Sequence, residues 1–369
     1  MAKKQERTNI QAHVLSHNAS TPVRSRSQNV STPTRSKSKC SGESSLSRSN
    51  MTPSPDTVAC KSLILAFDKL DLRNTSPVRY DNLYKTVKVL SKTILGNMSK
   101  AINRKSNKIR AVKKFNKVKL QRRRNISRGE SFHVELKLMN WLRANPHEGL
   151  IAACPEHEQV DDPTDKYIVM PFASHGDLLS FVDKHGGKVS EKIVRDIFLQ
   201  LVSALQYLHQ TAGYLHGDIS PENILVSYDK AGRLRVQLCD YGLACKIGSR
   251  HHCRGKKSYK APEHFSKQPS TAKPSADIFS LAHVMFLLHY GKPAFATARH
   301  TDEHYSGLEH KCHYRASTYS SWLRAWGYSK KRCEWALLPT ILTMFKRDPR
   351  QRPTLNRIKE TVEGWKHWA

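Results

Sequence analysis

The hydrophobic periodicity of this chain changes near Phe172, and that change constrains its fold more than any other feature. Before it, residues 84–90 (YKTVKVL) and 108–115 (KIRAVKKF) alternate polar and apolar side chains, and residues 166–172 (KYIVMPF) form a short apolar run. These patterns predict strands of an antiparallel sheet. After it, residues 190–209 repeat apolar side chains at helical spacing. The sequence therefore predicts an α+β protein with a small β lobe, a larger helical lobe and a cleft near residues 170–173.

Two helices can be placed from their apolar faces. Residues 131–143 set Val134, Leu138, Trp141 and Leu142 on one face, and Ser190 stands where it would cap the helix that follows. The stripe of that second helix consists of Val194, Ile197, Phe198, Leu201, Leu205 and Leu208.

The N-terminal segment has a different composition. Residues 1–66 contain no Phe, Trp or Tyr and are rich in Ser, Thr, Asn, Lys and Arg. Such a segment buries too little apolar surface to offset its ordering entropy. We therefore predict a disordered tail over residues 1–80, a small lobe over 81–172 and a large lobe over 173–369. The tail is either a phosphorylatable regulatory arm or an inert extension.

Charge and cysteine usage bear on partners and compartment. Lys and Arg number 62 against 31 Asp and Glu, a formal net charge of +31 that attracts polyanions and acidic proteins. The eight Cys show no repeated spacing, and the N-terminus lacks an apolar signal region. We expect a protein of the nucleus or cytoplasm that is neither secreted nor inserted in a membrane. The sequence indicates no oligomeric state.

Five polar residues occur in short motifs whose residue types suit phosphate chemistry. In chain order the motifs AVKKF, the helix 131–143, HGDISPEN and CDYG supply Lys113, Glu135, Asp218, Asn223 and Asp240. Taken singly, each has an ordinary explanation as a surface lysine, an exposed helix residue or a turn cap. Their occurrence in this order indicates a single site.

The ordered motifs resemble the signature set of eukaryotic-type protein kinases over roughly residues 84–365. The resemblance implies a bilobal protein-kinase-like fold that uses ATP and Mg²⁺. It implies that Lys113, fixed by Glu135, holds the nucleotide phosphates, because phosphoryl transfer depends on positioning and charge neutralisation. It also implies that Asn223 and Asp240 carry Mg²⁺ and that Asp218 is the catalytic base.

The same resemblance extends to flanking residues. It implies that Gly96, Met170, Phe172 and Ala173 contact the nucleotide, and that Glu263 and Arg352 form a buried ion pair in the helical lobe. The stretch GKKSYKAPE is similar to the pattern of serine/threonine kinases, so the expected acceptors are Ser or Thr hydroxyls of protein substrates. The divergent motifs resemble those of fast-evolving kinases such as viral ones.

Three departures from the family pattern stand out. The glycine-rich loop, placed by register at residues 95–103 (LGNMSKAIN), has Met98 and Ala101 where glycines are usual. Gly217 replaces the Arg that pairs with a phosphorylated activation segment in many members, so we expect activity without such phosphorylation.

The third departure is a pair of reciprocal substitutions. Ser220 replaces a catalytic-loop Lys, and Lys256 replaces a Thr that lies against that Lys in the family. We expect Lys256 to supply the lost charge, against the alternative that it is one more cation of a basic loop.

The basic residues of the chain bear on which substrates and partners it binds. The basic run at residues 113–125, with Arg250, Arg254, Lys256 and Lys257, predicts Ser or Thr acceptors flanked by acidic or phosphorylated residues. Direct nucleic-acid binding is a weaker expectation, because no stacking aromatic residues are interleaved with the charge. The alternative from another class is a pseudokinase that binds partners through its basic surface without turnover.

Overall fold

The computed structural model describes residues 79–124, 131–155, 158–160, 162–187, 189–251, 255–266, 268 and 270–365. All of them fall within one compact unit, Phe67–Ala369. The predicted tail therefore lies outside the described residues, apart from its last two positions. Among the helices described, none is long and apolar enough to cross a bilayer.

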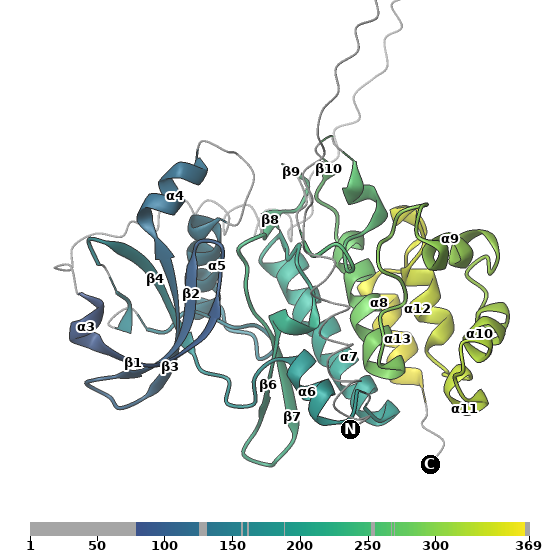
Figure 1. The fold of residues 1–369 in the computed structure, drawn as a ribbon, viewed down its shortest axis with the longest axis horizontal. Helices are drawn as coiled ribbons and strands as arrows, with labels where there is room; N and C mark the ends of the chain where they lie inside the picture. The colour runs from purple at the N-terminus through teal and green to yellow at the C-terminus, as the bar shows by residue number, and fades with distance from the viewer. Residues whose placement is uncertain are drawn as a thin grey trace, which may run out of the picture. The chain divides into compact units, whose positions relative to one another are not determined.

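The first part of the described chain is a four-stranded antiparallel sheet of order β1-β2-β3-β4 (Figure 1). The three predicted strands are confirmed, and a fourth lies between the first two. The elements of this first part are α3 (Tyr80–Leu83), β1 (Tyr84–Lys92), β2 (Gly96–Asn103), β3 (Ile109–Asn116), α4 (Lys117–Arg124), α5 (Phe132–Ala144) and β4 (Asp165–Pro171). The predicted α5 is confirmed: Leu138, Trp141 and Leu142 are buried in one core with Phe115 and Ile168.

The placement of the glycine-rich loop at residues 95–103 was wrong. Residues 96–103 form strand β2, and residues 93–95 are the turn that joins it to β1. Ala101 is fully buried in the core, and Met98 lies opposite Lys113 in the β2–β3 register. Gly96 is required by packing: a Cβ there would lie 1.9 Å from the Lys114 carbonyl oxygen. The loop motif was misplaced because its one glycine serves strand contact.

The rest of the chain is largely helical, as predicted. Its helices are α6 (Leu178–Lys184), α7 (Glu191–Gln206), α8 (Ser275–Tyr290), α9 (Glu303–His310), α10 (Ala316–Ala325), α11 (Lys330–Cys333), α12 (Leu338–Met344) and α13 (Leu355–Gly364), and α7 continues as a π-helical turn over Tyr207–Thr211. Short 3₁₀ turns cover Pro221–Asn223, Pro262–Phe265 and Pro349–Gln351. Ser190 caps α7 by accepting a hydrogen bond from the Ile193 amide, and every residue of the predicted stripe is buried.

Three small two-stranded antiparallel sheets within this helical part were not predicted. They pair β5 (Tyr214–Leu215) with β8 (Cys245–Lys246), β6 (Ile224–Tyr228) with β7 (Leu234–Leu238), and β9 (Arg250–His251) with β10 (Ser270–Thr271). Strands of two to five residues carry too few side chains for a periodic signal. These pairs hold the polar loops that contain the candidate site.

Candidate active site

Lys113 on β3 joins two carboxylates that come from distant parts of the chain. Its Nζ lies 2.9 Å from Glu135 Oε2 on α5 and 2.8 Å from Asp240 Oδ1, just after β7. The Lys113 and Glu135 side chains are 2% and 1% exposed. A buried ammonium and carboxylate persist only when paired and hydrogen-bonded, so this contact fixes the position of the Lys113 charge.

Asp240 is held in an unusual backbone conformation that directs its carboxylate to Lys113. Its φ is 64°, in the left-handed region that non-glycine residues rarely adopt. Burial opposes ionisation of this carboxyl, but the charge and hydrogen bond of Lys113 outweigh burial and lower the Asp240 pKa. Asp240 is therefore a carboxylate at neutral pH, which suits it to bind a cation.

Asp218 and Asn223 lie in the loop between β5 and β6 and contact each other directly. The Asn223 amide nitrogen donates to Asp218 Oδ2 at 2.9 Å and to the Asp218 carbonyl oxygen at 2.8 Å. The β6–β7 hairpin then brings Asn223 beside Asp240, because Ile224 pairs with Leu238 and the Cys239 amide donates to the Asn223 carbonyl oxygen. The five predicted polar residues are thus brought together in one place.

Asp277, in the first turn of α8, holds this loop in place by accepting hydrogen bonds from its backbone. Its Oδ2 accepts from the His216 amide and from His209 Nε2, both at 2.8 Å, and its Oδ1 accepts from the Gly217 amide at 3.0 Å. Burial disfavours the charged form, yet these donors keep the Asp277 pKa below its ordinary value. Sequence reasoning missed Asp277. The available signal was the one acidic residue of a long helix that is mostly apolar and buried.

Three of the four residues expected to contact the nucleotide lie at the end of β4. Met170 pairs with Ala111 and is buried, while Phe172 and Ala173 follow the strand and are partly exposed. Lys100 of β2 places its Nζ 4.9 Å from the centre of the Phe172 ring. Gly96, by contrast, belongs to the start of β2, where the β3 backbone passes close to it. Contact of these four residues with a nucleotide remains a prediction.

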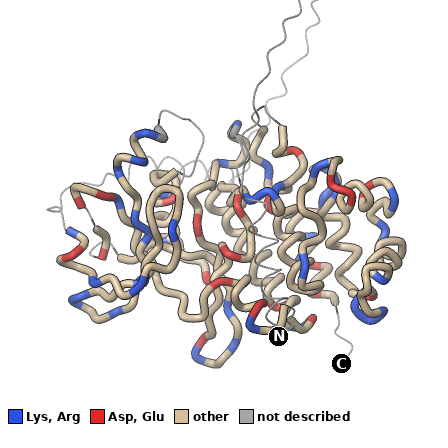
Figure 2. The backbone as a smooth tube through the Cα atoms, in the orientation of Figure 1, with Lys and Arg blue, Asp and Glu red and all other residues tan. Residues whose placement is uncertain are grey.

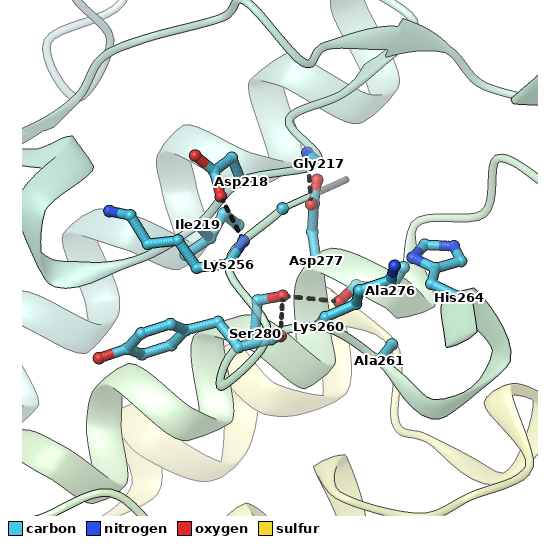
Figure 3. Close-up of a pocket in the computed structure, with 12 residues that line it drawn as sticks. Gly217, Asp218, Ile219, Lys256, Lys260, Ala261, His264, Ala276, Asp277 and Ser280 are labelled. Atoms are coloured by element: carbon cyan, nitrogen blue, oxygen red, sulfur yellow. Dashed lines mark hydrogen bonds between the residues drawn. The ribbon is translucent and has the colours of Figure 1, made fainter. Parts of the chain in front are cut away.

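Lys256 lies against the loop between β5 and β6 at three points. Its amide donates to Asp218 Oδ1 at 3.0 Å, its Nζ donates to Ser220 Oγ at 2.7 Å, and Nζ lies 3.2 Å from Glu222 Oε2. Ser220 is fully buried. The two residues that the sequence identified as reciprocal substitutions are therefore in direct contact. Figure 3 shows the Lys256 amide bonded to Asp218 while its side chain extends away along the loop.

The oxygen donors present fit a hard divalent cation. Asp240 receives its bonds from Lys113 and Gly242 on Oδ1, and its side chain is 40% exposed. Asn223 donates its side-chain hydrogen bonds to Asp218 through its amide nitrogen, so its amide oxygen remains as an acceptor. Mg²⁺ in proteins commonly takes one or two carboxylate or amide oxygens and completes its shell with phosphate and water. Asn223 and Asp240 would hold it here.

The predicted ion pair of the helical lobe is confirmed. Arg352 donates to both carboxylate oxygens of Glu263 at 2.7 Å, and the Arg352 side chain is fully buried. The pair ties the 3₁₀ turn Pro262–Phe265 to the segment before α13, which fixes the end of the loop that carries Lys256.

A small β lobe, a helical lobe and a lysine–carboxylate cluster between them define a kinase-type scaffold. The model of the protein kinase domain family matches residues 84–362, well over half of the chain. The chain therefore belongs to the protein kinase family.

Curated relatives agree with this assignment. The chain is 28% identical to a human SNF-related serine/threonine-protein kinase over 252 residues, which cover 68% of this chain and 29% of the relative. It is 29% identical to serine/threonine protein kinase OSK3 of rice (Oryza sativa subsp. indica) over 64% of this chain and 42% of that protein. It is 28% identical to the rat NUAK family SNF1-like kinase 2, over 67% and 39%. The chain spans less than half the length of these relatives.

Proposed function

We propose that the protein is a serine/threonine protein kinase that transfers the ATP γ-phosphoryl group to a protein hydroxyl. The observation that carries this proposal is the contact of Lys113 with both Glu135 and Asp240, which come from three separate segments of the chain. A chain with no need to bind phosphates would gain little from burying this lysine between two carboxylates.

Each polar group has a definite task in the proposed reaction. Lys113, held by Glu135, orients the nucleotide phosphates, and Asp218 accepts the proton of the attacking hydroxyl. Asn223 fixes the Asp218 carboxylate through its amide nitrogen. Bound Mg²⁺ would neutralise phosphate charge, and Asn223 and Asp240 would supply its protein oxygens.

The direct test is transfer of labelled phosphate from ATP to a generic Ser/Thr acceptor protein by the full chain. We expect transfer with Mg²⁺ and none after chelation with EDTA, and restoration when Mg²⁺ is returned. Binding of ATP without any transfer, under conditions that support other kinases, would favour the pseudokinase alternative, to which the substitutions at Gly217 and Ser220 point.

We propose further that the Lys256 ammonium replaces the missing catalytic-loop lysine. Its contact with buried Ser220 supports this role, because that serine occupies the position of the lost Lys. Lys256→Thr is expected to lower kcat about a hundredfold, the usual loss when a cation of the transition state is removed. Steady-state kinetics with a protein acceptor would measure it.

The matched controls are adjacent in the chain. Lys257→Thr removes an exposed lysine from the next position and should leave kcat unchanged. The double variant Ser220→Lys, Lys256→Thr should recover most of the loss, because it restores the family arrangement. Unimpaired turnover by Lys256→Thr alone would show that its ammonium takes no part.

We propose that activity does not require phosphorylation of residues 240–263. Main-chain bonds already hold part of this segment: the Gly248 amide donates to the Ala272 carbonyl oxygen and the Ala272 amide to the Ser249 carbonyl oxygen, beside the β9–β10 pair. Gly217, at φ +78°, has no side chain that could bind a phosphate there.

Phosphatase treatment, Ser249→Ala and Ser258→Ala are therefore expected to leave the transfer rate within about twofold. Ala272→Pro should lower the rate, because proline removes the donor to Ser249. The rates would be measured on protein whose phosphate content has been checked by mass spectrometry. Loss of activity on removal of a phosphate at Ser249 or Ser258 would refute the proposal.

We propose that the substrates are proteins whose acceptor is flanked by acidic or phosphorylated residues, and that the protein acts in the nucleus or cytoplasm. Lys and Arg number 62 against 31 Asp and Glu, and Figure 2 shows Lys and Arg positions spread along the described backbone. Such a surface attracts acidic partners by long-range electrostatics. Of the basic residues first expected to set this preference, Arg254 lies outside the described residues.

A further inference from the structure

A hollow beside the catalytic loop is bordered by cationic side chains (Figure 3). It encloses about 250 Å³, part of it open to solvent, and its lining includes Asp218, Lys256, Lys260 and His264. The wall formed by residues 255–261 packs tightly on the loop: a Cβ on Gly255 would lie 2.6 Å from the Gly217 carbonyl oxygen. Any peptide that presents a hydroxyl to Asp218 therefore passes next to this wall.

Two cations beyond this wall share one aromatic ring. The Lys260 Nζ lies 5.0 Å from the centre of the Phe265 ring, and the Arg299 guanidinium carbon lies 4.7 Å from it. The electron-rich faces of an aromatic ring attract cations, so Phe265 keeps two like charges close together that would otherwise repel. Phe265 ends the 3₁₀ turn that Glu263 ties to Arg352, which gives the two cations a rigid base.

Four acidic side chains of the surrounding elements are engaged within the protein. Glu263 binds Arg352, and Glu222 lies 3.2 Å from Lys256. Asp302 accepts hydrogen bonds from the amides of Ala296, Thr297, His304 and Tyr305. Asp277 also lines the hollow, but its carboxylate accepts from His209, His216 and Gly217.

Of the two cations on the Phe265 ring, Lys260 lines the hollow and is partly exposed, and Arg299 is exposed. A substrate side chain with negative charge gains Coulomb attraction here, whereas an arginine or lysine is repelled.

We propose that Lys260 and Arg299, held over Phe265, select substrates that carry a carboxylate or phosphate group beside the acceptor hydroxyl. The inference rests on the proposed kinase activity and names the residues that set its substrate choice. Sequence reasoning did not identify this pair, because Arg299 is 39 positions from Lys260 and belongs to no motif. Only the fold brings both to one ring.

The test uses a set of peptides with one Ser acceptor in an otherwise neutral sequence. A single flanking position, on either side, carries Ala, Glu, phosphoserine or Arg. For the wild-type chain we expect kcat/KM to be about tenfold higher with Glu or phosphoserine than with Ala, through KM, and lowest with Arg. A larger gain for phosphoserine than for Glu would identify a phosphate as the natural group, and equal gains would identify a carboxylate.

Charge reversal separates selection from a structural role. Lys260→Glu and Arg299→Glu should each lower kcat/KM for the acidic peptides and raise it for the Arg peptide, an inversion that loss of fold would not produce. The control is Lys292→Glu, an exposed lysine two residues past α8, whose last residue Tyr290 lies about 20 Å from Asp277 at the rise of an α-helix. Arg299 is exposed, so its variant carries the test if Lys260→Glu fails to fold.

Failure of the proposed kinase activity and failure of this inference give different results. If no peptide and no generic acceptor protein is phosphorylated, the proposed activity is wrong. If the chain phosphorylates acceptors but prefers Arg beside the hydroxyl, or if both reversal variants keep the acidic preference, the activity stands and this inference is overturned.

Discussion

Asp218→Asn is expected to reduce phosphoryl transfer about a thousandfold while the protein remains folded. Removal of a general base typically costs 10²- to 10⁴-fold, roughly, and an amide cannot accept the hydroxyl proton. The substitution conserves the size of the side chain, and an asparagine oxygen can still accept from the Lys256 amide that now bonds to Asp218 Oδ1. The bond from the Asn223 amide to Asp218 Oδ2 is lost, but that amide still donates to the carbonyl oxygen of residue 218. The surrounding loop should keep its shape, because Asp277 and not Asp218 binds the amides of His216 and Gly217.

The measurement is a single-turnover rate with labelled ATP, combined with nucleotide binding followed by thermal shift. We expect the rate to fall and nucleotide binding to persist, since Asp218 is assigned to the acceptor and not to the phosphates. Asp196→Asn, which removes a carboxylate that is 47% exposed on α7, should change neither quantity. A variant at Asp218 that keeps more than about a tenth of the rate would exclude its role as the base.

The residues of the candidate site could be found from sequence because their chemical types and their order are both constrained. Each of these residues lies in a stretch whose sequence predicts a strand, a helix or a loop, and such an order rarely arises by chance. They are Lys113, Glu135, Asp218, Asn223 and Asp240. The contact between Ser220 and Lys256 could be anticipated for a similar reason. When one position loses a charge and another gains one, proximity is the simplest physical explanation.

What the sequence did not reveal depends on backbone geometry. Gly96 looked like part of a phosphate-binding loop, but its missing side chain makes room for the Lys114 carbonyl group of the neighbouring strand. The β9–β10 pair consists of main-chain bonds between residues 250–251 and 270–271, which any side chains could make. The sequence marked Asp277 only as an acidic residue in a mostly apolar helix, and its role follows from the three hydrogen bonds that its carboxylate accepts from residues 209–217.

Lys113→Met tests the contact of Lys113 with Glu135 and Asp240 through stability as well as catalysis. Methionine has similar length but no charge, so Glu135 and Asp240 lose the ammonium that they share. Breaking a buried ion pair by removing one partner costs about 3–5 kcal/mol. We expect a value near 3 kcal/mol, because the Asp240 side chain is 40% exposed. Lys114→Met, one position along the same strand, removes a lysine that is 38% exposed and should cost no more than about 1 kcal/mol.

The pH dependence of this loss distinguishes electrostatics from packing. In the native protein the Asp240 pKa is lowered: burial opposes ionisation, but the Lys113 charge and hydrogen bond dominate. Its contribution to stability is therefore present above the ordinary carboxyl pKa and lost as pH falls through the native value. Without Lys113 only the Gly242 amide and His216 still oppose the effect of burial, so the Asp240 pKa rises, and the ionised carboxyl destabilises the fold at neutral pH. The difference in unfolding free energy between native protein and Lys113→Met, measured in urea, should narrow from pH 7 to pH 5. For Lys114→Met it should stay constant. If the loss of unfolding free energy in Lys113→Met does not change with pH, Lys113 stabilises the protein by packing. Glu135 and Asp240 would then not hold the Lys113 charge in place for a phosphate.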